Sequence, residues 1–144
     1  MASKKVSPRL ERDTTLNDGL VQLSFEVQSR LAKVAGDHDL SLAQLRLLGV
    51  LRDREPGIQQ LADHLGIEKS SVSGLVDRAE ARGLVRRTSS AEDGRAVHVT
   101  LAKRGRSLAE EGEREVATAL SDLVARLSTA ERDRLAELLR KCQA

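Results

Sequence analysis

The sequence predicts a mainly α-helical fold that carries one small antiparallel β-hairpin. Leucine, valine and alanine recur at helical spacing through most of the 144 residues, and alternating, strand-like character is confined to residues 84–101. Phe25 is the only aromatic residue, so the core has to consist of aliphatic side chains, which suits packed helices. The length is sufficient for one domain with a substantial core.

The N-terminal helix is expected from about Thr14 to Ala35. Its apolar residues are separated by steps of four and three and therefore form one stripe: Leu16, Leu20, Leu23, Val27, Leu31 and Val34. Residues 1–13 precede this stripe, are polar and of mixed charge, and are expected to be flexible.

The second helix is predicted to start after Ser41, because Ser41 and Gln44 have the spacing of a capping box. It ends before Pro56-Gly57, which breaks the pattern. The residues expected to face inward are Leu42, Leu45, Leu48 and Leu51.

Two further helices follow with a tight turn between them. The first, near residues 58–65, is amphipathic and stops at Gly66; the second, near residues 69–82, is stopped by Gly83. Two helices joined by a short glycine-containing turn form a helix-turn-helix. The inward residues are Leu61, Ala62 and Leu65 of the first helix and Val72, Leu75, Val76 and Ala79 of the second.

The first turn of the helix at 69–82 carries small hydroxyls, one cation and no apolar bulk. Such a turn can enter a DNA groove, donate to phosphates and let base edges approach, and the helix N-terminus adds backbone donors. The alternative is that Ser70 and Ser71 only cap and solvate a surface helix.

The following hairpin favours the first of these interpretations. Residues 84–88 and 96–101 are predicted to be strands, and the polar loop between them contains Asp93-Gly94, a hairpin signal. The result is a winged helix-turn-helix with Arg95 near the tip of the wing. Arg86 and Arg87 alternate in the first strand, so only one of them can face DNA.

Charge is distributed unevenly although the net charge is only +2. Residues 69–106 contain nine basic and four acidic groups, while the remaining residues are acidic on balance. A basic module on an acidic frame steers phosphates toward one surface.

The C-terminal region is predicted to contain two helices, one from about Ala102 to Leu127 and one opened by a capping box at Ser128 and Glu131. Their stripes are Val116, Leu120, Leu123 and Leu127, and then Leu135, Leu138 and Leu139.

The small winged module cannot bury both terminal stripes, which favours pairing between two chains over a monomeric bundle. We therefore expect a winged helix-turn-helix DNA-binding domain at residues 41–101, flanked by N- and C-terminal dimerisation helices at 14–40 and 102–144.

These motifs, in this order and spacing, resemble the MarR family of bacterial transcription regulators. Flanking helices extend the resemblance over all but roughly the first dozen residues. The motifs that carry it are Leu61-Ala62 before Leu65-Gly66, Ser71-Val72-Ser73, Leu75-Val76-Asp77-Arg78, Ala81-Arg82-Gly83-Leu84-Val85, and Asp93-Gly94-Arg95 followed by Val99-Thr100-Leu101.

The resemblance implies a homodimer that binds a palindromic operator in double-stranded DNA as a repressor. Arg95 would enter the minor groove and Asp93 would orient it, while Arg78 would reach a phosphate or a base edge. Gly74 stands where many relatives carry a larger polar side chain, so base readout is expected to be weaker there. The predicted DNA-binding residues are Lys69, Ser70, Ser71, Ser73, Gly74, Arg78, Arg87, Asp93 and Arg95.

A small-molecule effector would, by the same resemblance, bind between the first, second and fifth helices and the winged module. Because Phe25 is the only ring in the chain, this pocket is expected to be aliphatic, with Arg46 or Arg52 anchoring an acidic ligand.

No enzyme, metal site or cofactor site is predicted, because the three histidines are scattered and no Cys/His spacing resembles a zinc site. His38, between Asp37 and Asp39, has the composition of a metal-site fragment, but a solvated loop is the simpler interpretation. With no long apolar run and no apolar signal region at the N-terminus, we expect a cytoplasmic protein without membrane contact.

Two other functions remain open at this stage. A winged-helix module could bind protein instead of DNA, which retention on heparin with a steep salt dependence would discriminate. An architectural DNA binder that responds to no ligand would coat DNA uniformly instead of protecting one palindrome.

Overall fold

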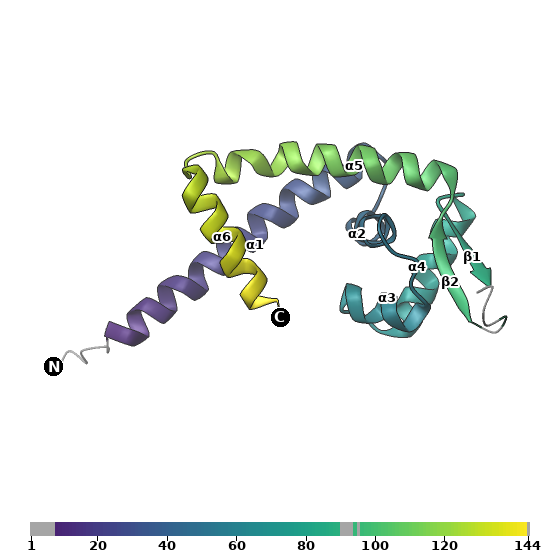
Figure 1. The fold of residues 1–144 in the computed structure, drawn as a ribbon, viewed down its shortest axis with the longest axis horizontal. Coiled ribbons are helices and arrows are strands. Elements are labelled where there is room, and N and C mark those ends of the chain that lie inside the picture. The colour runs from purple at the N-terminus through teal and green to yellow at the C-terminus, as the bar shows by residue number, and fades with distance from the viewer. Residues whose placement is uncertain (1–7, 90–93, 95, 144) are drawn as a thin grey trace.

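The computed structural model describes residues 8–89, 94 and 96–143, and for residues 8–13 the backbone alone. It confirms a mainly helical fold with one two-stranded antiparallel sheet (Figure 1). The elements are α1 Pro8–Asp37, α2 Leu42–Leu51, α3 Ile58–Leu65, α4 Lys69–Ala81, β1 Val85–Ser89, β2 Val97–Leu101, α5 Lys103–Ser121, a 3-10 turn at Asp122–Val124 and α6 Thr129–Cys142.

The molecule is elongated, and α5 runs along it from the wing to the end where α6 turns back (Figure 1). The winged module, α2 to β2, occupies one end, and the outer part of α1 extends away from it at the other. Among the described helices, none combines the length and apolar character that crossing a membrane requires.

Helix α1 begins at Pro8, earlier than the expected start near Thr14. Proline suits a helix start because its missing N–H would have no partner in the first turn. The predicted stripe divides in two: Val34 is buried, whereas Leu16 and Leu20 are 62% and 52% exposed. The outer half of α1 therefore presents apolar side chains that this chain leaves uncovered.

The turn after α1 is held by its own backbone. Asp39 adopts a left-handed conformation with φ of 55°, and the N–H groups of His38 and Leu40 both donate to the carbonyl of Ala35. The predicted capping box is confirmed: Ser41 Oγ accepts from the N–H of Gln44, whose side chain accepts from the N–H of Ser41.

Helix α2 is the centre of the core and contacts α1, α3, α4, α5 and β2. Leu48 and Leu51 are buried as predicted, but Leu42 and Leu45 are only half-buried, and the fully buried Leu47 was missed. The prediction assumed one apolar face, whereas α2 is covered from several sides. The other large side chains that are fully buried are Leu61, Val72, Val76, Leu84 and Val99.

The wing strands pair in one register, with Val85 opposite Leu101 and Arg87 opposite Val99. Both strands start one residue later than expected. The chain before α3 lies beside β2, where the N–H of Val99 donates to the carbonyl of Pro56 at 2.9 Å. This contact joins the wing to the helix-turn-helix.

Helix α5 ends at Ser121, earlier than the predicted end near Leu127, and a 3-10 turn follows. The capping box of α6 is confirmed, since Ser128 Oγ accepts from the N–H of Glu131. Hydrogen bonds from the backbone and hydroxyl of Ser128 keep the pKa of Glu131 below its ordinary value. No described residue of α6 is buried, and Leu138 is 43% exposed.

Gly105 sets how closely α5 approaches the wing. A Cβ added there would lie 1.8 Å from the carbonyl oxygen of Leu84, and the same oxygen accepts from the N–H of Ala102. The glycine, which looks unfavourable in a helix, is thus required by backbone-to-backbone packing.

Gly105→Ala is expected to lower the free energy of unfolding by at least about 2 kcal/mol, because the backbone of β1 or α5 has to shift. Gly49→Ala is the matched control: that position has open space around it and lies in a helix, so alanine should raise stability by about 0.5–1 kcal/mol. Urea unfolding at equal protein concentrations measures both. Equal stability of Gly105→Ala and the parent would contradict the packing requirement.

Candidate nucleic-acid interface

The helix-turn-helix is formed by α3 and α4, as predicted. Gly66 is left-handed, with φ of 66°, and both its N–H and that of Ile67 donate to the carbonyl of Ala62. This arrangement ends α3 sharply and lets the chain re-enter a helix at Lys69. Buried Val72, Leu75, Val76 and Ala79 fix the inner face of α4, so its opposite face is presented to solvent.

The N-terminal turn of α4 is available to a ligand. Lys69, Ser70 and Ser71 are exposed, and Ser73 is half-buried. Glu68 precedes the helix and makes no side-chain capping bond. The first backbone N–H groups of a helix have no acceptor within it, so this turn combines orphan donors, hydroxyls and one ammonium group.

Gly74 lies beneath Arg78, one turn later on the same face. A Cβ at position 74 would lie 3.3 Å from Nη1 of Arg78, so the guanidinium folds back over the glycine. The arginine is exposed and can swing outward from this position. The glycine thus leaves room for the guanidinium group of Arg78 on this face of α4.

Arg87 fastens the wing to α4. Its Nη2 lies 2.6 Å from Oδ1 of Asp77, its Nη1 lies 2.7 Å from Oε2 of Glu80, and its backbone N–H also donates to Glu80. The hydrogen bond to Asp77 is the main reason that the pKa of Arg87 is above its ordinary value. Asp77 of α4 is thus paired with an arginine of the wing.

The two arginines of β1 lie on opposite faces of the sheet. Arg87 faces α4 and is occupied by two carboxylates, whereas Arg86 lies on the other face of the sheet. Arg87 therefore holds the wing at a fixed position beside α4, and reaching a phosphate would require it to exchange partners. The predicted wing-tip residues Asp93 and Arg95 lie outside the described residues, so their roles stay predictions.

Arg82, at the C-terminal end of α4, was not singled out from the sequence. Its Nη1 donates to the carbonyl of Asp39 at 2.7 Å, and its own carbonyl accepts from Nη1 of Arg104 at 3.3 Å. The end of α4 is therefore bonded to both the α1–α2 turn and the start of α5. Only the position of Arg82 just before Gly83 could have suggested this capping role.

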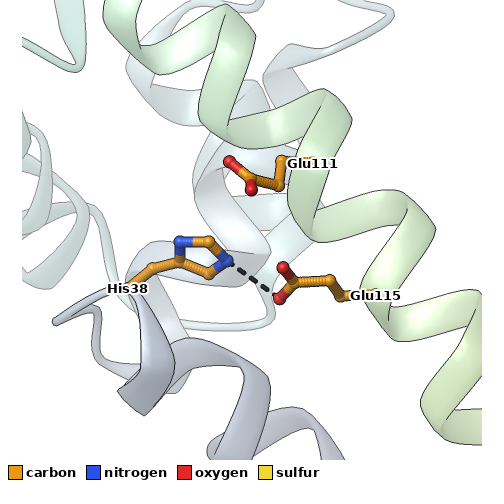
Figure 2. Close-up of side chains that lie close together, drawn as sticks. All are labelled: His38, Glu111 and Glu115. Atoms are coloured by element: carbon orange, nitrogen blue, oxygen red, sulfur yellow. Dashed lines mark hydrogen bonds and ion pairs between the residues drawn. The ribbon is translucent and has the colours of Figure 1, made fainter.

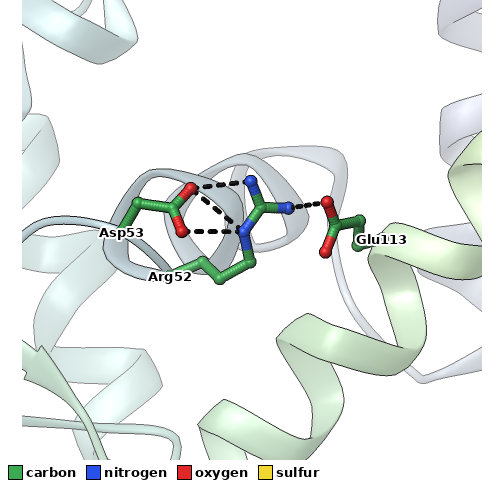
Figure 3. A network of polar contacts seen from close by, with 3 residues as sticks. All are labelled: Arg52, Asp53 and Glu113. Carbon is green, nitrogen blue, oxygen red and sulfur yellow. Dashed lines mark hydrogen bonds and ion pairs between the residues drawn. The ribbon is translucent and has the colours of Figure 1, made fainter.

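The three residues predicted to bind an effector do not share a cavity. Phe25 is 61% exposed on α1. Arg46, on α2, lines a separate hollow together with Arg54 and His64. Arg52 is held between Asp53 and Glu113 (Figure 3). The hydrogen bond with Asp53 raises the pKa of Arg52 and lowers that of Asp53.

A hollow of about 440 Å³ lies between α1 and α5. Its cations are Arg30, Lys33 and Arg114, its anions are Asp37 and Glu115, and its other walls include Val34 and Ala119. Nη1 of Arg30 donates to the carbonyl of Ala119 at 2.8 Å and lies 3.9 Å from Oδ2 of Asp122. The buried Nε makes no hydrogen bond with the described residues and lies 3.8 Å from Oε2 of Glu26. A guanidinium group at the wall of a hollow is suited to pairing with an acidic group.

His38 is brought together with two carboxylates of α5, and no sequence pattern connects them with it. His38, Glu111 and Glu115 lie side by side (Figure 2), and each offers an atom that a metal ion could use. Asp37 and Asp39, its neighbours in sequence, do not belong to this group.

Comparisons with known proteins agree with this architecture. A sequence model of the MarR family matches residues 38–96. The HTH-type transcriptional repressor Rv2887 of Mycobacterium tuberculosis is 30% identical over 134 residues, which cover 92% of this chain and 96% of the relative.

Solved structures extend the similarity to nearly the full length. NadR in complex with 4-hydroxyphenylacetate has a TM-score of 0.76 at 25% identity, covering 99% of this chain and 96% of NadR. BpsR of Bordetella bronchiseptica, whose DNA binding is regulated by 6-hydroxynicotinic acid, has a TM-score of 0.75 at 27% identity, covering 90% and 99%. This chain therefore belongs to the MarR family of DNA-binding transcription regulators.

Proposed function

We propose that this regulator is a repressor that binds a palindromic operator as a homodimer and releases it when a small acidic ligand binds. The observation that carries the proposal is the exposed, hydroxyl-rich first turn of α4, held on a buried apolar face and braced by the ion pairs of Arg87. In this proposal residues 41–101 read DNA, and residues 14–40 and 102–144 form the dimer.

In this proposal the first turn of α4 and the wing contact different grooves of the DNA. The first turn of α4 enters the major groove, with Lys69 on a phosphate and the serines near base edges. Arg95 enters the adjacent minor groove from the wing. Two copies of the module read two half-sites about one helical turn apart.

Arg95→Ala is expected to weaken binding to every site and to reduce the salt slope of the affinity by about one to two units per dimer, since each wing arginine releases about one counterion. Ser71→Ala should weaken binding with a nearly unchanged slope, because a hydroxyl releases no counterion. Titration of footprinted operator DNA at several salt concentrations measures both.

Arg126→Ala serves as the charge-matched control, because Arg126 is exposed on the segment between α5 and α6, outside the winged module. It should keep the parent affinity and slope. If Arg95→Ala also keeps both, the wing does not touch DNA. Uniform coating of DNA in the footprint would instead favour an architectural binder.

The dimer is supported by apolar side chains that this chain leaves exposed at both ends. Leu16, Leu20 and Leu23 of α1 and Leu138 and Leu139 of α6 are exposed. In Figure 1 the outer part of α1 crosses α6, apart from the winged module. Stripes of this kind on two helices mark an interaction surface. A second copy would cover these leucines, and the two winged modules would then lie on the same face of the dimer.

Leu138→Asp is expected to yield monomer or unfolded chain in sedimentation, because a charge in the apolar seam costs a few kcal/mol per protomer. Ala130→Asp adds the same charge in the exposed first turn of α6, about two turns away from Leu138, and should remain dimeric. A dimer that tolerates Leu138→Asp would place the interface elsewhere.

The effector site is proposed in the hollow between α1 and α5. Arg30 would anchor an acid through its guanidinium group, which would exchange its ion pairs with Glu26 and Asp122 for the ligand, while Val34 and Ala119 provide an aliphatic wall, as expected for a chain with a single aromatic residue. Two structural neighbours are described with hydroxylated aromatic acids. Such acids are the ligand class we propose.

Thermal shift with 4-hydroxyphenylacetate tests this site. The ligand should stabilise the parent and release operator DNA, and Arg30→Gln should weaken both effects about tenfold or more, as expected for the loss of a charge-assisted hydrogen bond. Arg46→Gln, outside the hollow, should behave like the parent. Loss of the response in Arg46→Gln alone would instead place the effector site in the hollow that Arg46 lines with Arg54 and His64.

A further inference from the structure

We propose that His38, Glu111 and Glu115 form a binding site for a divalent transition-metal ion of the zinc class. One ligand atom from each residue lies within 4.8 Å of the other two (Figure 2). The three side chains come from two elements that are distant in sequence, the end of α1 with its turn and the middle of α5.

His38 is held in place by backbone geometry. Its N–H donates to Ala35 at 3.1 Å, and the left-handed Asp39 turns the chain directly after it. The side chain is only 16% exposed, and Nε2 lies 2.9 Å from Oε2 of Glu115. The imidazole is therefore aimed at α5 and has little freedom to point elsewhere.

The two carboxylates are one helical turn apart, so they project from the same face of α5. Between them Gly112 is buried, and a Cβ there would lie 3.3 Å from Cδ1 of Leu45 on α2. This close packing brings α5 near enough to the α1–α2 turn for both carboxylates to reach the imidazole.

The donor set selects the class of ion. One imidazole nitrogen and two carboxylate oxygens suit zinc and neighbouring first-row ions, whereas magnesium and calcium prefer oxygen ligands alone. Zinc bonds of about 2.0–2.2 Å place ligand atoms roughly 3.4 Å apart in a tetrahedron. The contact between His38 and Glu115 would open slightly and Glu111 would rotate inward, which leaves a fourth position for water.

The simpler alternative is a hydrogen bond between His38 and Glu115 with no ion involved. Glu111 separates the two cases, because it is exposed and makes no hydrogen bond or ion pair with the described residues. A purely structural pair needs no third group. A metal site needs Glu111, and its loss would leave the contact between His38 and Glu115 intact.

Such an ion would act on the helix that reads DNA. It would clamp the α1–α2 turn to α5, and the carbonyl of Asp39 in that turn accepts from Arg82 at the end of α4. Helix α5 in turn begins at the wing, where the N–H of Ala102 donates to Leu84. This regulatory consequence rests on the proposed function, whereas the site itself does not.

The test uses full-length protein stripped with a chelator and titrated with ZnCl2 by calorimetry, and with CoCl2 by visible absorption. One ion per protomer is expected, and excess MgCl2 should not displace it. Glu111→Gln should weaken binding more than about tenfold, since even the loss of outer-shell partners has that effect. Glu110→Gln, the neighbouring exposed carboxylate, should bind like the parent.

Equal zinc affinity of Glu111→Gln and the parent would overturn the site, as would failure of the parent to bind one ion per protomer. Operator affinity is then measured with and without ZnCl2 in the parent and in Glu111→Gln. A zinc-dependent change in the parent alone supports the coupling to α4. Saturable zinc binding with unchanged operator affinity would overturn that coupling and leave the site, and metal-free operator binding tests the proposed function separately.

Discussion

The burial of α2 is the constraint on which the rest of the structure depends. This helix contacts α1 and α5 as well as α3, α4 and β2, so the DNA-reading module and the long outer helices share one core. Leu47, Leu48 and Leu51 are almost completely buried there, and no aromatic ring is available to fill gaps. A displacement of α1 or α5 must therefore be accommodated by the layer that supports α4.

Two arginines fix the position of α4 relative to the wing and the α1–α2 turn. Arg87 sets the distance between the wing and α4, and Arg82 bonds the far end of α4 to the α1–α2 turn. Both are partly exposed ion pairs or hydrogen bonds, which contribute more to position than to stability. Both arginines hold the C-terminal half of α4, where Asp77, Glu80 and Arg82 lie, and leave its first turn free of these contacts.

Most of the fold could be predicted from the sequence because its signals are local. Glycines at 66 and 83, the Ser41 and Ser128 capping boxes and the helical periodicity each act within a few residues. The burial of Leu47 escaped prediction because it depends on α2 being covered from several sides, and the early end of α5 because the stripe continues through a 3-10 turn.

The features of the candidate site also differ in whether the sequence could predict them. The hydroxyl-rich first turn of α4 could be recognised because it lies within one helix. The partners of Arg87, the Arg82 contact and the approach of His38 to Glu111 and Glu115 join residues far apart in the sequence, where no periodicity connects them. Arg46 and Arg52 were chosen by charge alone, and the fold placed them apart.

The all-aliphatic core also determines how the molecule interacts with light. The chain contains no tryptophan and no tyrosine, and its single phenylalanine is exposed on α1. The folded protein is therefore almost transparent near 280 nm and has no intrinsic fluorescence of its own in that range. The optical signals of a bound aromatic acid or of DNA appear against a nearly dark background, and one introduced tryptophan would be the sole fluorophore in each chain.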